Sequence, residues 1–172
     1  MRELILGGAR SGKSALAQQR AEAGGLAVTC IVTATPDDLE MAERIAHHQA
    51  ERPADWLVVE EPIELTAALT EHAAPDRCLL VDCLTLWLSN ILADGVDTTF
   101  PLQRQALLDT LPRLPGEIIL VGNEIGLGVV PMGKLTRRFV DENGRLHQAI
   151  ATRCERVTLC VAGLPMTLKE ES

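Results

Sequence analysis

The chain has 172 residues and a formal net charge of −8, and its length fits one domain with a core of its own. The acidic balance argues against proteins that hold nucleic acid or an anionic membrane through a general positive surface. Apolar residues make up 47% of the chain, yet there are two Trp, two Phe and no Tyr, so we expect an aliphatic core.

The five cysteines are odd in number and show no C-x-x-C spacing. Most lie in or beside apolar runs, which predicts small buried thiols rather than a zinc site. The first residues carry one Arg and a short apolar run, which does not fit a secretory signal peptide. No segment reaches the length of a membrane span, so we expect a cytoplasmic protein.

Short apolar runs alternate with helix-length segments along the chain. The expected strands are residues 3–8, 26–34, 56–61, 78–83, 117–124 and 156–163. The expected helices are Ser14–Ala23, Asp37–Glu51, Ile63–Ala73, Leu84–Ala93, Leu102–Leu111 and Leu135–Arg153, the last with a break near Gly144. Runs that are apolar on both faces are typical of a parallel sheet covered by helices. We therefore predict a single α/β domain over residues 1–172, with a mostly parallel sheet and helices on both faces.

The stretch "GGARSGKS", residues 7–14, lies between the first expected strand and the first expected helix. It matches the P-loop pattern, in which glycines let backbone N–H groups surround the oxygens of a phosphate chain. Lys13 would reach the terminal phosphates, the Ser14 hydroxyl would ligate Mg²⁺, and Arg10 and Ser11 would contact phosphate or substrate. A glycine-rich turn with a chance lysine is the alternative, but the strand-and-helix context favours a bound nucleoside triphosphate.

Asp82 follows the apolar run "LLV" at the end of an expected strand. P-loop enzymes need a carboxylate near the metal, usually at the end of a neighbouring strand. Asp82 would also serve as a cap for the helix that begins near Leu84, and the two roles are compatible. We expect Asp82 to share an Mg²⁺ site with Ser14.

The stretch from Thr35 to Glu51 predicts a capped helix that carries a histidine pair, His47 and His48. On a helical wheel each histidine lies about 130° from the centre of the apolar stripe, on opposite sides, so periodicity does not choose between them. Two solvated histidines near a helix end are one interpretation. The other is nucleophilic catalysis, in which a neutral imidazole attacks phosphorus and forms a phosphoramidate.

A glycine-rich stretch, "VGNEIGLGVVPMGK", follows the fifth expected strand. Asn123 and Glu124 stand where the strand ends, at the edge where open α/β sheets bind ligands. An ordinary strand-to-helix connection followed by a solvated basic face explains the segment equally well. By itself it does not name a function.

Four of these stretches together resemble one family. "GGARSGKS", the histidine pair before "ERPADW", "LLVDCLTLWLSN" and "VGNEIGLGVVP" occur in the order and spacing of the bifunctional adenosylcobinamide kinase/adenosylcobinamide-phosphate guanylyltransferases of cobalamin biosynthesis. The resemblance spans nearly the whole chain. It implies a RecA-like P-loop NTPase sheet that includes an antiparallel strand, and a homotrimer.

The resemblance also implies two reactions. ATP or GTP first phosphorylates the hydroxyl of the aminopropanol arm of adenosylcobinamide. A histidine then attacks the α-phosphorus of GTP, and the resulting enzyme–GMP adduct passes GMP to adenosylcobinamide phosphate. The family forms this adduct on the first histidine of the pair, which is His47 here.

The residues that the resemblance assigns fall on three kinds of position. His47 and Lys13 are catalytic, and Ser14 and Asp82 hold Mg²⁺. The expected nucleotide contacts are Gly7, Gly8, Ala9, Arg10, Ser11, Gly12, Lys13, Ser14, Thr33, Ala34, Thr35, His48, Gln49, Ala50, Glu51, Glu60 and Asp82. Val140 and His147 depart from the Arg and Asn of many relatives, which puts any substrate contact at those two positions in doubt.

Two rival functions remain open from the sequence. A P-loop kinase of another small metabolite would bind nucleotide but form no covalent adduct with GMP. A nucleotide-dependent switch protein would bind nucleotide without any transfer to cobinamide.

Overall fold

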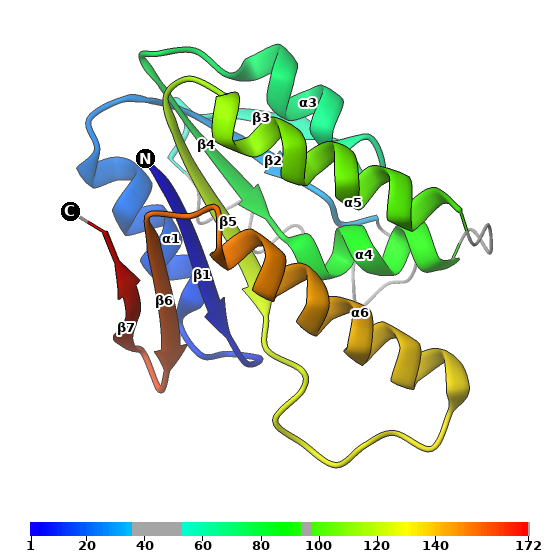
Figure 1. Ribbon diagram of the computed structural model, residues 1–172. Coiled ribbons are helices and arrows are strands. Elements are labelled where there is room, and N and C mark those ends of the chain that lie inside the picture. Colours follow the sequence, from blue (N-terminus) through cyan, green and yellow to red (C-terminus); the bar gives the residue numbers. More distant parts are fainter. Residues whose placement is uncertain (36–52, 94–97, 172) are drawn as a thin grey trace.

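The computed structural model describes residues 1–35, 53–93 and 98–171. Within these ranges seven strands form one sheet in the order β3-β2-β4-β5-β1-β6-β7 (Figure 1). The strands are β1 Arg2–Gly7, β2 Ala27–Val32, β3 Leu57–Glu60, β4 Arg77–Asp82, β5 Glu117–Asn123, β6 Arg156–Val161 and β7 Leu164–Glu170. All neighbouring pairs are parallel except β6 and β7, which confirms the predicted mostly parallel sheet.

The antiparallel strand β7 has no counterpart among the strands expected from apolar runs. It pairs with β6 through a tight turn in which Ala162 and Gly163 have φ of 53° and 78°. Two successive residues with positive φ give the turn that matches the natural twist of a hairpin. The apolar residues of β7 alternate at Leu164, Met166 and Leu168, a pattern that indicates a strand with one apolar face.

Helices cover both faces of the sheet, as predicted (Figure 1). They are α1 Lys13–Ala23, α3 Leu65–His72, α4 Leu84–Ala93, α5 Thr99–Thr110 and α6 Lys134–Ala151. Helix α1 packs on one face, against a buried cluster that includes Ile5, Leu80 and Val121. The other four helices pack on the opposite face.

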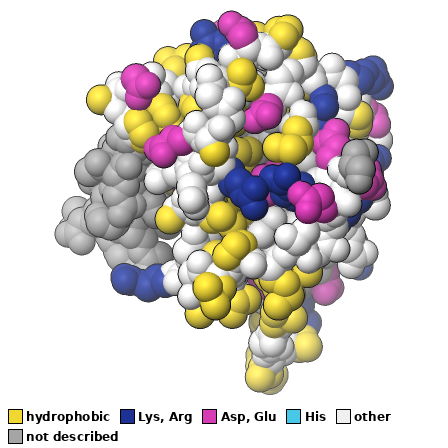
Figure 2. All heavy atoms as spheres, turned by 90° about the vertical axis from the view of Figure 1, so that its left-hand side faces the viewer, with side chains coloured by type: hydrophobic (Ala, Val, Ile, Leu, Met, Phe, Trp, Pro, Cys, Tyr) yellow, Lys and Arg dark blue, Asp and Glu magenta, His cyan; other side chains and the backbone are white. Residues whose placement is uncertain are grey.

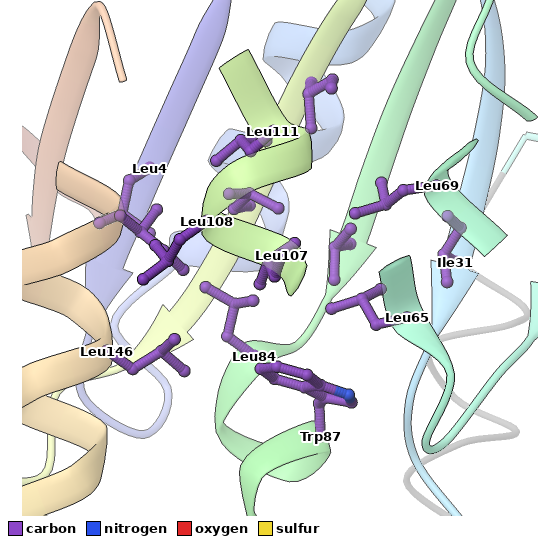
Figure 3. Close-up of a cluster of buried hydrophobic side chains, with 14 of the residues drawn as sticks. Leu4, Ile31, Leu65, Leu69, Leu84, Trp87, Leu107, Leu108, Leu111 and Leu146 are labelled. Atoms are coloured by element: carbon purple, nitrogen blue, oxygen red, sulfur yellow. The ribbon is translucent and has the colours of Figure 1, made fainter. Parts of the chain in front are cut away.

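The larger core lies between the sheet and helices α3 to α6. Figure 3 shows leucines from strands and helices in one cluster, with Trp87 at its lower edge below Leu84; in the described part of the chain Trp87 is the largest fully buried side chain. The indole N–H of Trp87 donates to the carbonyl oxygen of Ile63 at 2.7 Å, so its one polar group is satisfied. Apart from Trp87 and Phe100 this core is aliphatic, as the composition predicts.

The cysteines are buried free thiols, which confirms the sequence prediction. Burial raises the pKa of the Cys78, Cys83 and Cys154 thiols to about 12, so these groups stay protonated and unreactive. Within residues 1–35, 53–93 and 98–171, no helix combines the length and the apolar character needed to cross a bilayer.

The expected break near Gly144 is wrong, because α6 runs without interruption from Lys134 to Ala151. A stripe of buried side chains on both sides of Gly144, including Asn143 and Leu146, holds the helix against the sheet. Tertiary packing therefore outweighs the low helix propensity of one glycine, which costs about 1 kcal/mol.

Replacing Gly144 with alanine should stabilise the protein by about 0.5–1 kcal/mol. A Cβ at this position would meet no atom within 4 Å, so only the conformational entropy of the unfolded chain changes. Urea titration measures the difference. Gly116→Ala is the matched contrast: Gly116 has φ of +78° and a Cβ there would collide with backbone oxygens of Ala74 and Arg77, so this variant should be destabilised. A destabilised Gly144→Ala would contradict the continuous helix.

Candidate active site

The P-loop turns sharply between the end of β1 and the start of α1. Gly12 has φ of +91° and Arg10 has φ of +53°, conformations that point successive backbone N–H groups towards one side of the loop. The Ser11 N–H donates to the Gly8 carbonyl oxygen at 3.3 Å, and the Lys13 ammonium donates to the same oxygen at 3.2 Å. Lys13 thus lies folded over the loop, next to the space that a phosphate chain would enter.

The turn between β6 and β7 braces the P-loop from outside. The Ser11 carbonyl oxygen accepts hydrogen bonds from the Gly163 N–H at 2.8 Å and from the Cys160 thiol at 3.0 Å. A Cβ on Gly12 would lie 3.0 Å from the Gly163 Cα, and one on Gly7 would lie 2.7 Å from the Cys160 carbonyl oxygen. These two glycines are therefore required by the adjoining hairpin as well as by phosphate binding.

Asp82 and Glu60 stand in one row across the sheet, with Val32 between them. Neighbours in a parallel register share a face, and Val32 belongs to the cluster packed against α1. Both carboxylate side chains therefore face the side on which the P-loop leads into α1. Asp82 is separated from the P-loop strand only by β5, so the two strands lie about 10 Å apart.

Thr33 supports the end of β4. Its hydroxyl accepts from the Cys83 N–H at 3.0 Å and donates to the Cys83 carbonyl oxygen at 2.7 Å. Its own carbonyl oxygen accepts from the Asn90 side chain at 2.7 Å, and the residue is fully buried. Thr33 therefore holds the backbone beside Asp82, whereas Ala34 and Thr35 are half-exposed beyond it.

A buried polar network that sequence reasoning missed lies behind the end of β5. The Asn123 N–H donates to the Thr85 hydroxyl at 2.8 Å, which in turn donates to the Asn143 side-chain oxygen at 3.1 Å. The Asn143 amide nitrogen donates to the Asn123 carbonyl oxygen at 3.1 Å, which closes the ring. Each partner comes from a different element, α4, β5 or α6, so no local pattern marks the network.

His147 extends this network, since its Nδ1 lies 3.5 Å from the amide nitrogen of Asn143. The ring is only 5% exposed and packs over Gly122, where a Cβ would lie 2.5 Å from Nε2. Burial lowers the pKa of His147 to about 4, against the raising effect of the Glu124 carboxylate. His147 is therefore neutral at pH 7 and is buried behind the end of β5.

Glu124 begins the long connection to α6 at the same edge of the sheet. Its N–H donates to the Gly7 carbonyl oxygen at 3.0 Å, and its carboxylate accepts from the Gly126 N–H at 2.6 Å. The connection thus starts directly beside the P-loop. Further along it protrudes from the body of the protein (Figure 1).

The buried, neutral imidazole of His147 makes the stability of the fold depend on pH. Unfolded His147 titrates near pH 6.5, whereas the folded form stays neutral down to about pH 4, so stability should fall as the pH drops through this window. The free energy of unfolding of the wild type should fall between pH 7 and pH 4.5, and this fall should be smaller by about 2 kcal/mol in His147→Gln. Urea titrations of both proteins at the two pH values measure this, and parallel losses would show that His147 protonates freely in the folded state.

The histidine pair that the sequence predicts for the site cannot be placed relative to the P-loop. The predicted residues His47, His48, Gln49, Ala50 and Glu51 lie outside the described residues. The described chain stops at Thr35, past the end of β2, and resumes at Pro53, ahead of β3. Thr35 therefore lies just past the carboxyl edge of the sheet, where Asp82 stands, whereas Pro53 precedes the amino end of β3, at the opposite edge.

Comparisons with known proteins identify the family of the chain. A family model described as cobinamide kinase/cobinamide phosphate guanyltransferase matches residues 3–168. The bifunctional adenosylcobalamin biosynthesis protein CobP of Pseudomonas aeruginosa is 61% identical over 171 residues, which cover 99% of each chain. CobU of Salmonella typhimurium is 35% identical over 182 residues, covering 96% of this chain and 98% of that protein.

Among solved structures, the RadB recombinase superposes with a TM-score of 0.54 at 14% identity, covering 92% of this chain and 73% of that one. A likeness at this identity bears on the fold alone, and it supports the RecA-like arrangement of the sheet. The sequence relatives carry the functional argument. The chain belongs to the cobinamide kinase/cobinamide phosphate guanylyltransferase family, the bifunctional enzymes of adenosylcobalamin biosynthesis.

Proposed function

We propose that residues 1–172 form one domain that runs both reactions at the carboxyl edge of the sheet, with His47 as the residue that carries GMP. The observation that carries the proposal is the shared face of the P-loop, Asp82 and Glu60. From β1 to β3 this edge spans four strand spacings, about 19 Å, which accommodates an extended nucleoside triphosphate. We assign the triphosphate to the P-loop end and the nucleoside to the end formed by residues 34–35 and Glu60.

The donor set of Ser14 and Asp82 fits Mg²⁺. A hydroxyl and a carboxylate are hard oxygen ligands, and Mg²⁺ in nucleotide sites takes few protein ligands and completes its shell with phosphates and water. The ion, when bound, neutralises charge on the phosphate chain. Ser14 is at the start of α1 and Asp82 is at the end of β4, so the two residues approach the phosphates from opposite sides.

In the kinase step, the hydroxyl oxygen of the aminopropanol arm of adenosylcobinamide attacks the terminal phosphorus of ATP or GTP. The bond from that phosphorus to its bridging oxygen breaks, the nucleoside diphosphate leaves, and the hydroxyl proton is released. The P-loop N–H groups and the Lys13 ammonium stabilise the charge on the transferred group.

In the guanylyl step, an imidazole nitrogen of His47 attacks the α-phosphorus of GTP and pyrophosphate leaves. An oxygen of adenosylcobinamide phosphate then attacks the same phosphorus, the nitrogen–phosphorus bond breaks, and adenosylcobinamide-GDP forms. The support is the resemblance to the guanylyltransferase family, in which the first histidine of the pair carries GMP, and the exit of the chain from β2 through Ala34 and Thr35 at the carboxyl edge of the sheet.

Incubation of the protein with GTP and Mg²⁺ should add the mass of one guanylyl group, GMP less the elements of water, to the chain. His47→Ala should abolish this adduct because it removes the attacking nitrogen, whereas His48→Ala, the matched control, should retain it. Intact-mass spectrometry before and after acid treatment makes the measurement, since a phosphoramidate is acid-labile. An adduct that persists in His47→Ala moves the role to another residue, and its absence from the wild type favours the simple kinase.

We further propose that the enzyme is a homotrimer, with β7 and the β5–α6 connection in the contacts between copies. Leu164, Met166 and Leu168 of β7 are 71%, 57% and 55% exposed. The connection adds Leu127, Val129, Val130 and Met132, each at least 73% exposed. Figure 2 shows hydrophobic side chains on this side of the molecule and on the protrusion at its base. Exposed apolar surface of this extent is typical of a surface that a partner covers.

Sedimentation velocity should give three times the mass of one chain. Replacing Met166 and Leu168 together with lysine should shift the protein to monomer, because burying two ammonium groups at an interface is costly. Leu102→Lys is the matched control, since Leu102 is 69% exposed on α5. A double variant that sediments as the wild type does would place the contact elsewhere.

A further inference from the structure

Asn123 stands between the P-loop and Asp82. Strand β5 lies between β1 and β4, and in the register Asn123 is opposite Gly7, while Asp82 is opposite Val121. Asn123 therefore reaches about 7 Å beyond the row of Asp82, in the direction in which the strands end. Ile119 and Val121 pack against α1, so alternation places the Asn123 side chain on that same face.

The backbone of Asn123 is fixed even though its neighbour β4 has already ended. The last paired residue of β4 is Asp82, so no strand remains on that side to pair with Asn123. The Thr85 hydroxyl and the Asn143 amide take the place of that strand by binding the Asn123 N–H and carbonyl oxygen. On its other side β5 stays paired with β1 as far as Gly7. The position of the side chain is therefore set from both sides.

The side-chain amide of Asn123 makes no hydrogen bond within the described part of the chain, and the residue is half-buried. Its backbone, in contrast, is bound by buried partners on a rigid strand. The Asn123 amide is free to bind a ligand, because it has no partner among the described residues and its backbone is held at the carboxyl edge of the sheet. Asn90 and Asn143 contrast with it, because their side chains are both used within the fold.

We propose that Asn123 is a catalytic residue of the kinase step, and that its Nδ2–H donates to the terminal phosphate of the bound nucleotide. This inference rests on the proposed placement of the triphosphate in the P-loop. As the terminal phosphoryl group passes to the substrate hydroxyl, charge is carried on its non-bridging oxygens, and a fixed neutral donor stabilises them. The amide neither gains nor loses a proton, so the bonds made and broken in the kinase step stay as described above.

The chemistry of the amide explains why a carboxylate would not serve at this position. Asp82 already brings one negative charge to the same face, and a second carboxylate would repel the phosphates. An aspartate in place of Asn123 keeps the size and the acceptor oxygen but loses the N–H donor. The donor role and a merely space-filling role therefore predict opposite results for Asn123→Asp.

The test compares Asn123→Ala and Asn123→Asp with Gln105→Ala, which removes an exposed amide on α5. We expect both Asn123 variants to lower kcat for phosphorylation of adenosylcobinamide by about 100-fold. The Kd of Asn123→Ala for ADP should change less than threefold, and its melting temperature should stay within about 2 °C of wild type, because the amide holds nothing in the fold. Gln105→Ala should match the wild type throughout.

Three results would overturn the inference: a kcat for Asn123→Ala near the wild-type value, a wild-type kcat for Asn123→Asp, or a loss of kcat that a lower melting temperature accompanies. ADP binding and the GMP adduct are measured on the same wild-type preparation. If wild-type protein binds no ADP, the nucleotide placement itself fails. If wild-type protein binds ADP and forms the adduct while Asn123→Ala keeps full kcat, only the role of Asn123 fails.

Discussion

The conformation of the P-loop depends on hydrogen bonds to the carbonyl oxygens on the outer side of its turn. Backbone N–H groups that point inward to phosphate leave carbonyl oxygens pointing outward, and these need partners of their own. The Ser11 carbonyl oxygen finds them in the Gly163 N–H and the Cys160 thiol. The hairpin that ends the chain is therefore part of the nucleotide site that begins it. The antiparallel strand β7 pairs with β6, the neighbour of β1, and the turn between β6 and β7 thereby reaches the P-loop.

The order of the strands brings the P-loop close to Asp82. With β5 between β1 and β4, the P-loop and Asp82 face each other across one strand. Strands such as β4 are apolar on both faces, Leu79 and Val81 on one and Cys78 and Leu80 on the other, because helices cover both sides of the sheet. The register, in which Val32 is opposite both Asp82 and Glu60, places these two carboxylates on one face.

Much of this could be predicted from local patterns, because an apolar strand and a P-loop each leave a signal within a few residues. The alternation at Leu164, Met166 and Leu168 is also a signal of this kind, and it indicates the strand β7. The break expected at Gly144 was wrong because propensity is weaker than packing. The ring of Thr85, Asn123 and Asn143 joins positions up to 58 residues apart, so only the folded chain reveals it.

The buried network of Thr85, Asn123 and Asn143 fixes the position of the end of β5 more than it adds to the stability of the fold. Each of its hydrogen bonds replaces one with water, so the net gain is about 1 kcal/mol, whereas an unpaired buried group costs about 1–3 kcal/mol. Such a network stabilises the fold only where its members are paired, as Thr85, Asn123 and Asn143 are. The Nδ1 of a neutral His147 can accept from Asn143, whereas its Nε2 is buried without a hydrogen-bond partner in the described part of the chain. A protonated ring would present a donor to a donor and loosen Asn143, and with it Asn123. The burial that lowers the pKa of His147 therefore protects the geometry of the strand end at which the nucleotide is placed.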